Sequence, residues 1–206
     1  ATGMVVMGFG FGALVMSKIL APLFLEMTNG DLSRSFLYIG LLLLILLPLF
    51  ASFLHLPKTE NTVSEEKSVA RVFDYILAKP FIILWLMFLI NVIAGMVFIS
   101  FQSPLLQDLL KAGMPTGTDF SDTALIHSLS AAGGTLIAVS SVFNGLGRFF
   151  WGGVSDKIGR IPTFRLLLGV QAVIFIGLIF VGQPLVFSVF VCVVLLCYGG
   201  GFGVVP

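Results

Sequence analysis

Charged residues are scarce in this chain. Only 10% of its 206 residues are Asp, Glu, Lys or Arg, whereas about 25% is usual in a soluble domain. Hydrophobic residues make up 58%, and the mean hydropathy is +1.10. This composition excludes a soluble enzyme, and a net charge of only +1 provides no field that would attract nucleic acid. The sequence therefore predicts a membrane protein with no nucleic-acid partner.

Cysteine and histidine are also rare. Cys192 and Cys197 lie inside one apolar run, which favours packing over a disulfide framework. His55 and His127 lie far apart and match no metal-ligand spacing. The apolar segments contain neither a nucleophile–base pair nor a metal cluster. We therefore expect no metal, no cofactor and no enzymatic activity.

Six apolar stretches are each long enough to cross about 30 Å of hydrocarbon as a helix. They cover roughly residues 3–25, 35–54, 81–105, 124–154, 163–181 and 185–206. In lipid the backbone must satisfy its own hydrogen bonds, which favours helices for such continuous runs. We predict an all-α, polytopic membrane protein with six transmembrane helices. Because the chain opens on one apolar stretch and ends within another, we expect a fragment of a longer protein.

Basic residues in the loops predict the orientation. Two of the loops hold seven basic residues: Lys58, Lys67, Arg71, Lys79, Lys157, Arg160 and Arg165. The other three loops hold only Arg34 and Lys111. By the positive-inside rule, residues 55–79 and 155–162 are cytoplasmic in a multi-pass protein of the cell (inner) membrane. Apolar residues at helical spacing over 68–77 suggest a short amphipathic helix. A solvated linker between two helical bundles is the favoured interpretation of residues 55–79.

A distinctive motif follows the fourth apolar stretch, at residues 152–160 (GGVSDKIGR). Gly152 and Gly159 would allow close backbone approach in a tight turn. Asp156 could accept hydrogen bonds from a neighbouring helix N-terminus, and Lys157 and Arg160 would anchor the loop in the cytoplasm. The motif resembles the G-x-x-x-D-[RK]-x-G-R signature of the major facilitator superfamily. A plain positive-inside hairpin would explain only the basic residues.

The resemblance implies a domain organisation. In that superfamily the signature follows the second helix of each six-helix half, so residues 124–154 resemble the eighth of twelve helices. Residues 1–54 would then be the last two helices of the N-terminal half-bundle, and residues 55–79 the cytoplasmic linker. Residues 80–206 would be the first four helices of the C-terminal half-bundle. The partners of these helices would be the lipid bilayer and the missing helices of the full-length chain.

Three further segments are similar to the oxalate/formate antiporter family, which is related to the monocarboxylate transporters. They are residues 91–95 (NVIAG), 145–152 (GLGRFFWG) and 197–203 (CYGGGFG). The resemblance implies a secondary active transporter of small organic anions, carboxylates such as oxalate or formate, working by alternating access and antiport. A proton-coupled monocarboxylate symporter remains an alternative. So does a transporter-like membrane receptor that does not transport.

Arg148 is the strongest candidate for substrate binding. It lies seven residues before Ser155, about 10 Å from the predicted cytoplasmic turn. An arginine at the centre of a membrane helix costs about 2.5–3.5 kcal/mol on insertion scales. Its guanidinium matches a carboxylate bidentately and stays charged. The family resemblance implies this role, whereas a side chain that snorkels to the interface, or pairs within the bundle, is the structural alternative.

Other polar residues within the spans are weaker candidates. Tyr198 could offer its hydroxyl to an anion or form one wall of an aromatic cage. Val194, one turn earlier, supplies no second ring. Asn91 and Asn144 could equally line the cavity or form hydrogen bonds between helices.

Two polar residues are expected near the membrane surface. Lys18 would snorkel from the outer end of the first span, and Gln102 would be interfacial. Glycine clusters at residues 8–12, 133–134 and 199–203 favour close helix packing and bending.

Overall fold

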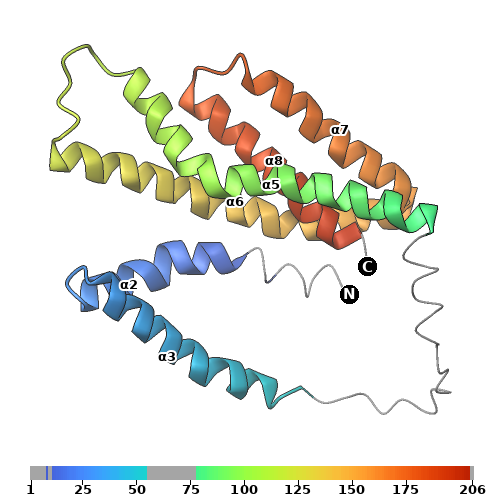
Figure 1. The fold of residues 1–206 in the computed structure, drawn as a ribbon, viewed down its shortest axis with the longest axis horizontal. Coiled ribbons are helices and arrows are strands. Elements are labelled where there is room, and N and C mark those ends of the chain that lie inside the picture. Colours follow the sequence, from blue (N-terminus) through green and yellow to red (C-terminus); the bar gives the residue numbers. More distant parts are fainter. Residues whose placement is uncertain (1–7, 9–10, 55–77, 205–206) are drawn as a thin grey trace. The chain divides into compact units, whose positions relative to one another are not determined.

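The computed structural model describes residue 8 and residues 11–54 and 78–204. The elements described are η1 (Met16–Leu20), α2 (Ala21–Met27), α3 (Leu32–Ala51), α5 (Lys79–Ala112), α6 (Thr123–Ile158), α7 (Arg160–Leu178) and α8 (Pro184–Val204) (Figure 1). All of them are helices, η1 being a single π-helical segment that continues into α2. The described part of the chain contains no strand, and the predicted all-α class is confirmed.

Five of the described helices, α3 and α5 to α8, are long and apolar enough to cross a membrane. They correspond to the second to sixth apolar stretches of the sequence. The first stretch is described only from its middle onward, where residues 11–27 are helical apart from the π-turns of η1. The amphipathic helix predicted at 68–77, and most of the predicted linker, lie outside the described residues.

Capping residues begin α3 and α6, and a glycine connects α6 to α7. The Asp31 side chain accepts a hydrogen bond from the backbone N–H of Arg34 (3.2 Å) at the start of α3. Asp122 does the same for the backbone N–H of Ala124 (3.0 Å) at the start of α6. Each carboxylate thus satisfies an N–H that has no partner within its own helix. Gly159, with φ 90°, connects α6 to α7 in a conformation that favours glycine.

The chain divides into two compact units, and we describe each by itself. The smaller unit is Ile19–Trp85 and contains α2 and α3. Its helices meet at a tight turn in which Thr28 Oγ1 and Ser35 Oγ are 2.8 Å apart. Gly30, two residues before the start of α3, has a left-handed backbone conformation with φ 83°.

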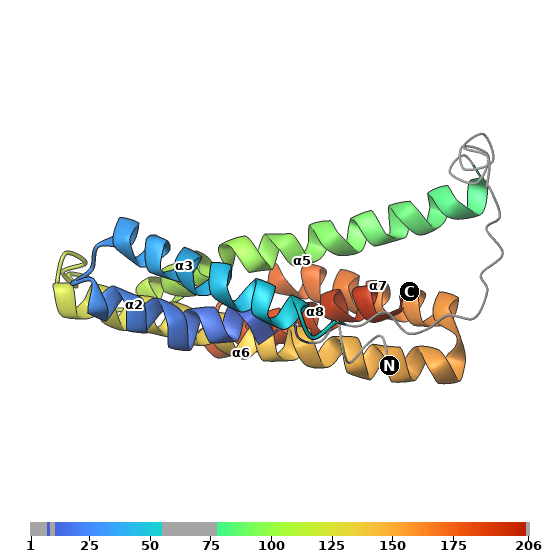
Figure 2. The ribbon, with the colours of Figure 1, turned by 90° about the horizontal axis from the view of Figure 1, so that it is seen from below.

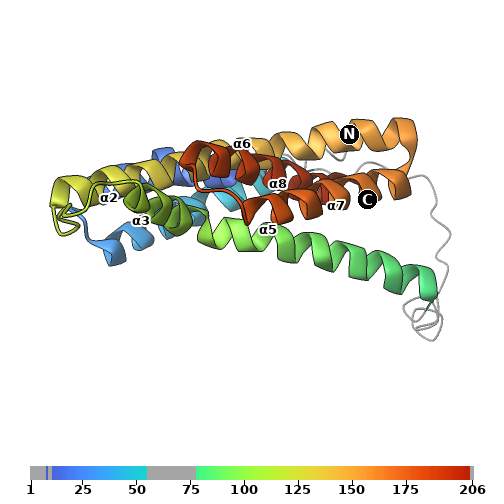
Figure 3. The same ribbon diagram turned by 90° about the horizontal axis from the view of Figure 1, so that it is seen from above.

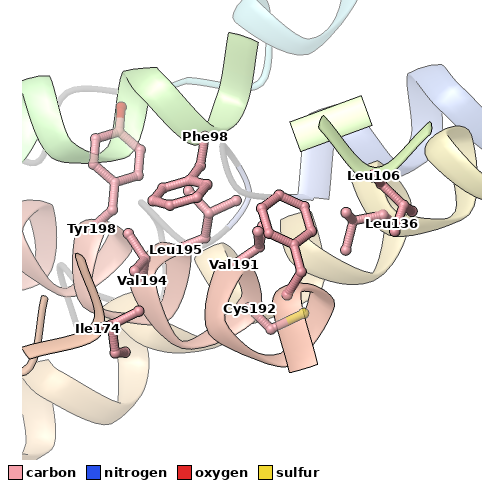
Figure 4. Packing of buried hydrophobic residues seen from close by; sticks show 10 residues of the cluster. Phe98, Leu106, Leu136, Ile174, Val191, Cys192, Val194, Leu195 and Tyr198 are labelled. Atoms are coloured by element: carbon pink, nitrogen blue, oxygen red, sulfur yellow. The ribbon is translucent and has the colours of Figure 1, made fainter. Parts of the chain in front are cut away.

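The larger unit comprises Ala1–Lys18 and Leu86–Pro206 and contains most of α5 and all of α6 to α8. Within it, α8 packs most extensively against α6 and also contacts α7 (Figure 2, Figure 3). A buried apolar cluster fills the space between α8 and its neighbours (Figure 4). Its members on α8 include Val191, Val194 and Leu195, and Phe98 joins them from α5.

Glycines allow the backbones of α6 and α8 to touch. A Cβ atom at Gly199 or Gly203 of α8 would overlap backbone atoms of α6, and one at Gly147 of α6 would overlap the backbone of α8. We call these three residues the glycine seam. Gly199 and Gly203 form the G-x-x-x-G spacing that brings membrane helices into close contact. The seam fixes the position of the α8 side chains relative to those of α6.

Candidate functional site

Arg148 lies well inside α6, ten residues before the end of the helix at Ile158. It is only 1% exposed, and its guanidinium carbon stands over the ring of Phe202 on α8, 5.0 Å from the ring centroid. A snorkelling arginine would expose its guanidinium at the end of the span. The observed burial does not fit that alternative, and it places a permanent positive charge inside the larger unit.

The ring that contacts the guanidinium is part of an aromatic cluster. The ring of Phe202 meets Tyr198 edge-on, with centroids 5.1 Å apart, and meets Phe88 of α5 edge-on at 5.0 Å. Arg148 therefore contacts the face of the Phe202 ring, while Tyr198 and Phe88 pack edge-on against that ring. The face of an aromatic ring attracts a cation. We call Phe88, Tyr198 and Phe202 the aromatic cluster.

Phe202 is the residue that the sequence analysis missed. Val194, one turn before Tyr198, supplies no second ring, and the structure has that ring one turn after Tyr198, at Phe202. The signal was present, because residues 199, 200, 201 and 203 are all glycine. On this turn of α8, only Tyr198 and Phe202 carry large side chains.

Asn91 lies between three helices and is fully buried, with 0% exposure. Its Nδ2 donates to the backbone carbonyl of Tyr198 (3.2 Å), and its Oδ1 accepts from Nε2 of Gln171 on α7 (2.9 Å). The sequence left two roles open for Asn91, lining a cavity or forming hydrogen bonds between helices, and the structure shows the hydrogen bonds.

Asn144 stands one turn before Arg148 on α6 and is 7% exposed. It faces α8 at the glycine seam, where a Cβ at Gly199 would overlap its backbone carbonyl. Within the described part of the chain, its Oδ1 accepts no hydrogen bond. Asn144 is therefore a buried polar side chain that lies one helical turn from Arg148 on α6.

The signature motif spans the end of α6 and the start of α7. Asp156, Lys157 and Arg160 are exposed. A Cβ at Gly152 would stand 3.8 Å from the backbone carbonyl oxygen of Gly203, an ordinary van der Waals contact, so the described chain has room for a methyl group there. Gly159 supplies the turn itself: its N–H donates to the carbonyl of Ser155 (2.9 Å).

Two residues expected at the membrane surface have partners in the larger unit. Lys18 Nζ donates to Thr135 Oγ1 of α6 (3.0 Å). Gln102 is 3% exposed, and its Oε1 accepts from Ser140 Oγ (2.7 Å). The interfacial position expected for Gln102 stays a prediction; the structure shows its side chain packed against α6, with α5 continuing ten residues beyond it to Ala112.

An apolar cavity of about 550 Å³ is lined by residues of α5, α6 and α8. Its lining residues are Leu106, Ala132, Thr135, Leu136, Val139, Phe143, Leu185, Ser188, Val189, Cys192 and Val193. Arg148, Asn144 and Tyr198 are not among them. Cys192 and Cys197 are free thiols buried in apolar clusters, in agreement with a packing role.

Comparisons with known proteins agree with the motifs. The family model described as Major Facilitator Superfamily matches residues 1–206. A curated relative, the oxalate:formate antiporter of Oxalobacter formigenes, is 26% identical over 180 residues, which are 84% of this chain and 38% of the relative. This chain therefore spans well under half the length of that relative. No solved structure matches significantly. The resemblance noted at the signature motif is confirmed, and the chain belongs to the major facilitator superfamily.

Proposed function

We propose that this chain forms part of a secondary active transporter that exchanges small carboxylates, such as oxalate and formate, by alternating access. The observation that carries the proposal is the burial of Arg148, which is 1% exposed within a membrane-type helix. Such a charge is costly to place there, and residues of this kind usually mark a substrate pathway. The name of the oxalate:formate antiporter relative supports the choice of carboxylates.

The geometry at Arg148 suits a carboxylate. The guanidinium carbon stands 5.0 Å from the centroid of the Phe202 ring, and a planar guanidinium presents its N–H donors along its edges. A carboxylate can then accept two parallel hydrogen bonds in the plane of the group. The aromatic cluster excludes water, which strengthens this charge-assisted contact. Asn144 and Tyr198 are proposed as further polar contacts, with Asn91 at the edge of the site.

The buried charge also favours antiport. Moving the two halves of a transporter around an empty site would carry the arginine through a low-dielectric region without a bound anion. A bound carboxylate neutralises that charge and lowers the barrier to reorientation. The loaded transporter would therefore reorient quickly and the empty one slowly, so that export of one anion requires import of another.

Counterflow in proteoliposomes containing the complete transporter tests this proposal. With radiolabelled oxalate inside, we expect rapid efflux only when oxalate or formate is present outside. Arg148→Ala should abolish the exchange and Arg148→Lys should keep part of it. Arg165→Ala, which removes an exposed positive charge from α7, is the matched control and should exchange normally.

Each alternative has its own outcome in this assay. Efflux at full rate with no external anion would exclude antiport. Uptake driven by an inward proton gradient would identify a proton-coupled symporter. Binding of oxalate without any flux would indicate a receptor, and normal exchange by Arg148→Ala would overturn the role assigned to the arginine.

A further inference from the structure

Asn91 makes a hydrogen bond to α8 that the helix itself does not need. The carbonyl of Tyr198 lies inside a regular helix, where the backbone already supplies a donor. It nevertheless accepts a second hydrogen bond, from Asn91 Nδ2 (3.2 Å), since a carbonyl oxygen has two lone pairs. Gln171 of α7 donates to Asn91 Oδ1 (2.9 Å). The amide is thereby held with its nitrogen toward Tyr198.

Gly95, one turn further along α5, provides room for the ring of the same tyrosine. A Cβ atom at Gly95 would overlap three ring atoms of Tyr198. Figure 4 shows the side chain of Tyr198 extending from α8 to α5. In return, Gly201 of α8 leaves room for Asn91, because a Cβ there would overlap the Asn91 amide. We call Asn91 and Gly95 the α5 socket.

The socket connects to Arg148 through two aromatic contacts. Tyr198 meets Phe202 edge-on, with centroids 5.1 Å apart and planes at 80°. Phe202 in turn lies under the guanidinium, 5.0 Å from its carbon. Close-packed interiors transmit small displacements, so a shift of the Tyr198 ring would move Phe202 and the guanidinium stacked on it.

We propose that Asn91 and Gly95 are positioning residues that set the orientation of the Arg148 guanidinium, and with it the selectivity between carboxylates of different size. This inference rests on the proposed function. A Tyr198 ring displaced by a Cβ at Gly95 would press on Phe202, which it meets edge-on, and so turn the guanidinium. Oxalate has two carboxylates to place in the site and formate has one, so oxalate binding depends more on the orientation of the guanidinium and would suffer more.

Equilibrium binding of radiolabelled oxalate and formate to the purified complete transporter tests the proposal. For Gly95→Ala we expect oxalate affinity to fall about tenfold or more, because a misplacement of about 1 Å in a site can cost about 100-fold. The affinity for formate should fall less. Gly134→Ala on α6 is the matched control: a Cβ there meets open space, and both affinities should stay unchanged.

A double-mutant cycle separates positioning from general damage to α5. If Gly95→Ala acts by displacing the Tyr198 ring, it should have no additional effect once Tyr198→Ala has removed that ring. An unchanged ratio of oxalate to formate affinity, or additive effects in the double variant, would overturn the proposal. If Gly95→Ala does not yield folded protein, Asn91→Ala is measured in its place with the same expectation for the affinity ratio.

Wild type and Arg148→Ala distinguish failure of this inference from failure of the proposed function. If wild type binds neither anion, or if Arg148→Ala binds both normally, the proposed function fails. If wild type binds oxalate in an Arg148-dependent manner and Gly95→Ala leaves the affinity ratio unchanged, only the positioning role fails.

Discussion

At the scale of single residues, the arginine within α6 is the feature that requires explanation. A cation over an aromatic face gains about 0.5–2 kcal/mol, more when water is excluded. That gain is comparable to the insertion cost of an arginine, about 2.5–3.5 kcal/mol. Phe202 therefore offsets part of the cost of burying Arg148.

Phe202→Leu tests this contact. The substitution keeps an apolar side chain but removes the ring face under the guanidinium, so we expect oxalate affinity to fall several-fold. A loss of about 1 kcal/mol of cation–π energy corresponds to about fivefold. Phe149→Leu, at an α6 position that is 58% exposed, is the control and should bind normally. Equal affinities for the two variants would contradict the role of Phe202.

The sequence alone identifies some of the residues around the candidate site and not others. Arg148 stands out because its neighbours are apolar, so a pattern of hydropathy alone identifies it. Phe202 does not stand out among 21 phenylalanines, and only its contact with the guanidinium distinguishes it. The contact of Gln102 with Ser140 was not foreseen, because hydropathy finds the bilayer-length part of α5 but not which polar side chains meet across helices.

At the scale of elements, the glycine seam determines which side chains of α6 and α8 face one another. Gly203 lies directly against the backbone of Arg148. Because the helices touch there, Phe202, the neighbour of Gly203 in the chain, comes within reach of the guanidinium. The sequence predicted close packing at residues 199–203, but a glycine cluster does not specify which helix it contacts.

Gly203→Ala should destabilise the larger unit. The added Cβ would overlap the backbone carbonyl of Arg148, and overpacking of this kind costs about 1–3 kcal/mol. We expect the Gly203→Ala protein to unfold at a lower temperature than wild type, as measured by circular dichroism in detergent. Gly153→Ala introduces the same methyl group into open space on α6. A Gly203→Ala protein as stable as Gly153→Ala would show that the helices do not require the seam.

At the scale of the whole molecule, the described helices belong to a chain of the major facilitator superfamily. Long apolar runs made the helices predictable, since membrane solvation leaves little choice of structure. The predicted division into residues 1–54, a linker and residues 80–206 stays a prediction. The compact units of this chain have different bounds, Ile19–Trp85 and the remainder.

Direct binding of oxalate to Arg148 is the central claim, and equilibrium dialysis of the purified complete transporter tests it most directly. Truncating one partner of a buried charge pair costs about 2–5 kcal/mol, so Arg148→Ala should weaken oxalate binding about 30-fold or more. Arg148→Lys should retain part of the affinity, because it keeps the charge but loses the bidentate geometry. A folded Arg148→Ala protein that binds oxalate as tightly as wild type would contradict the account.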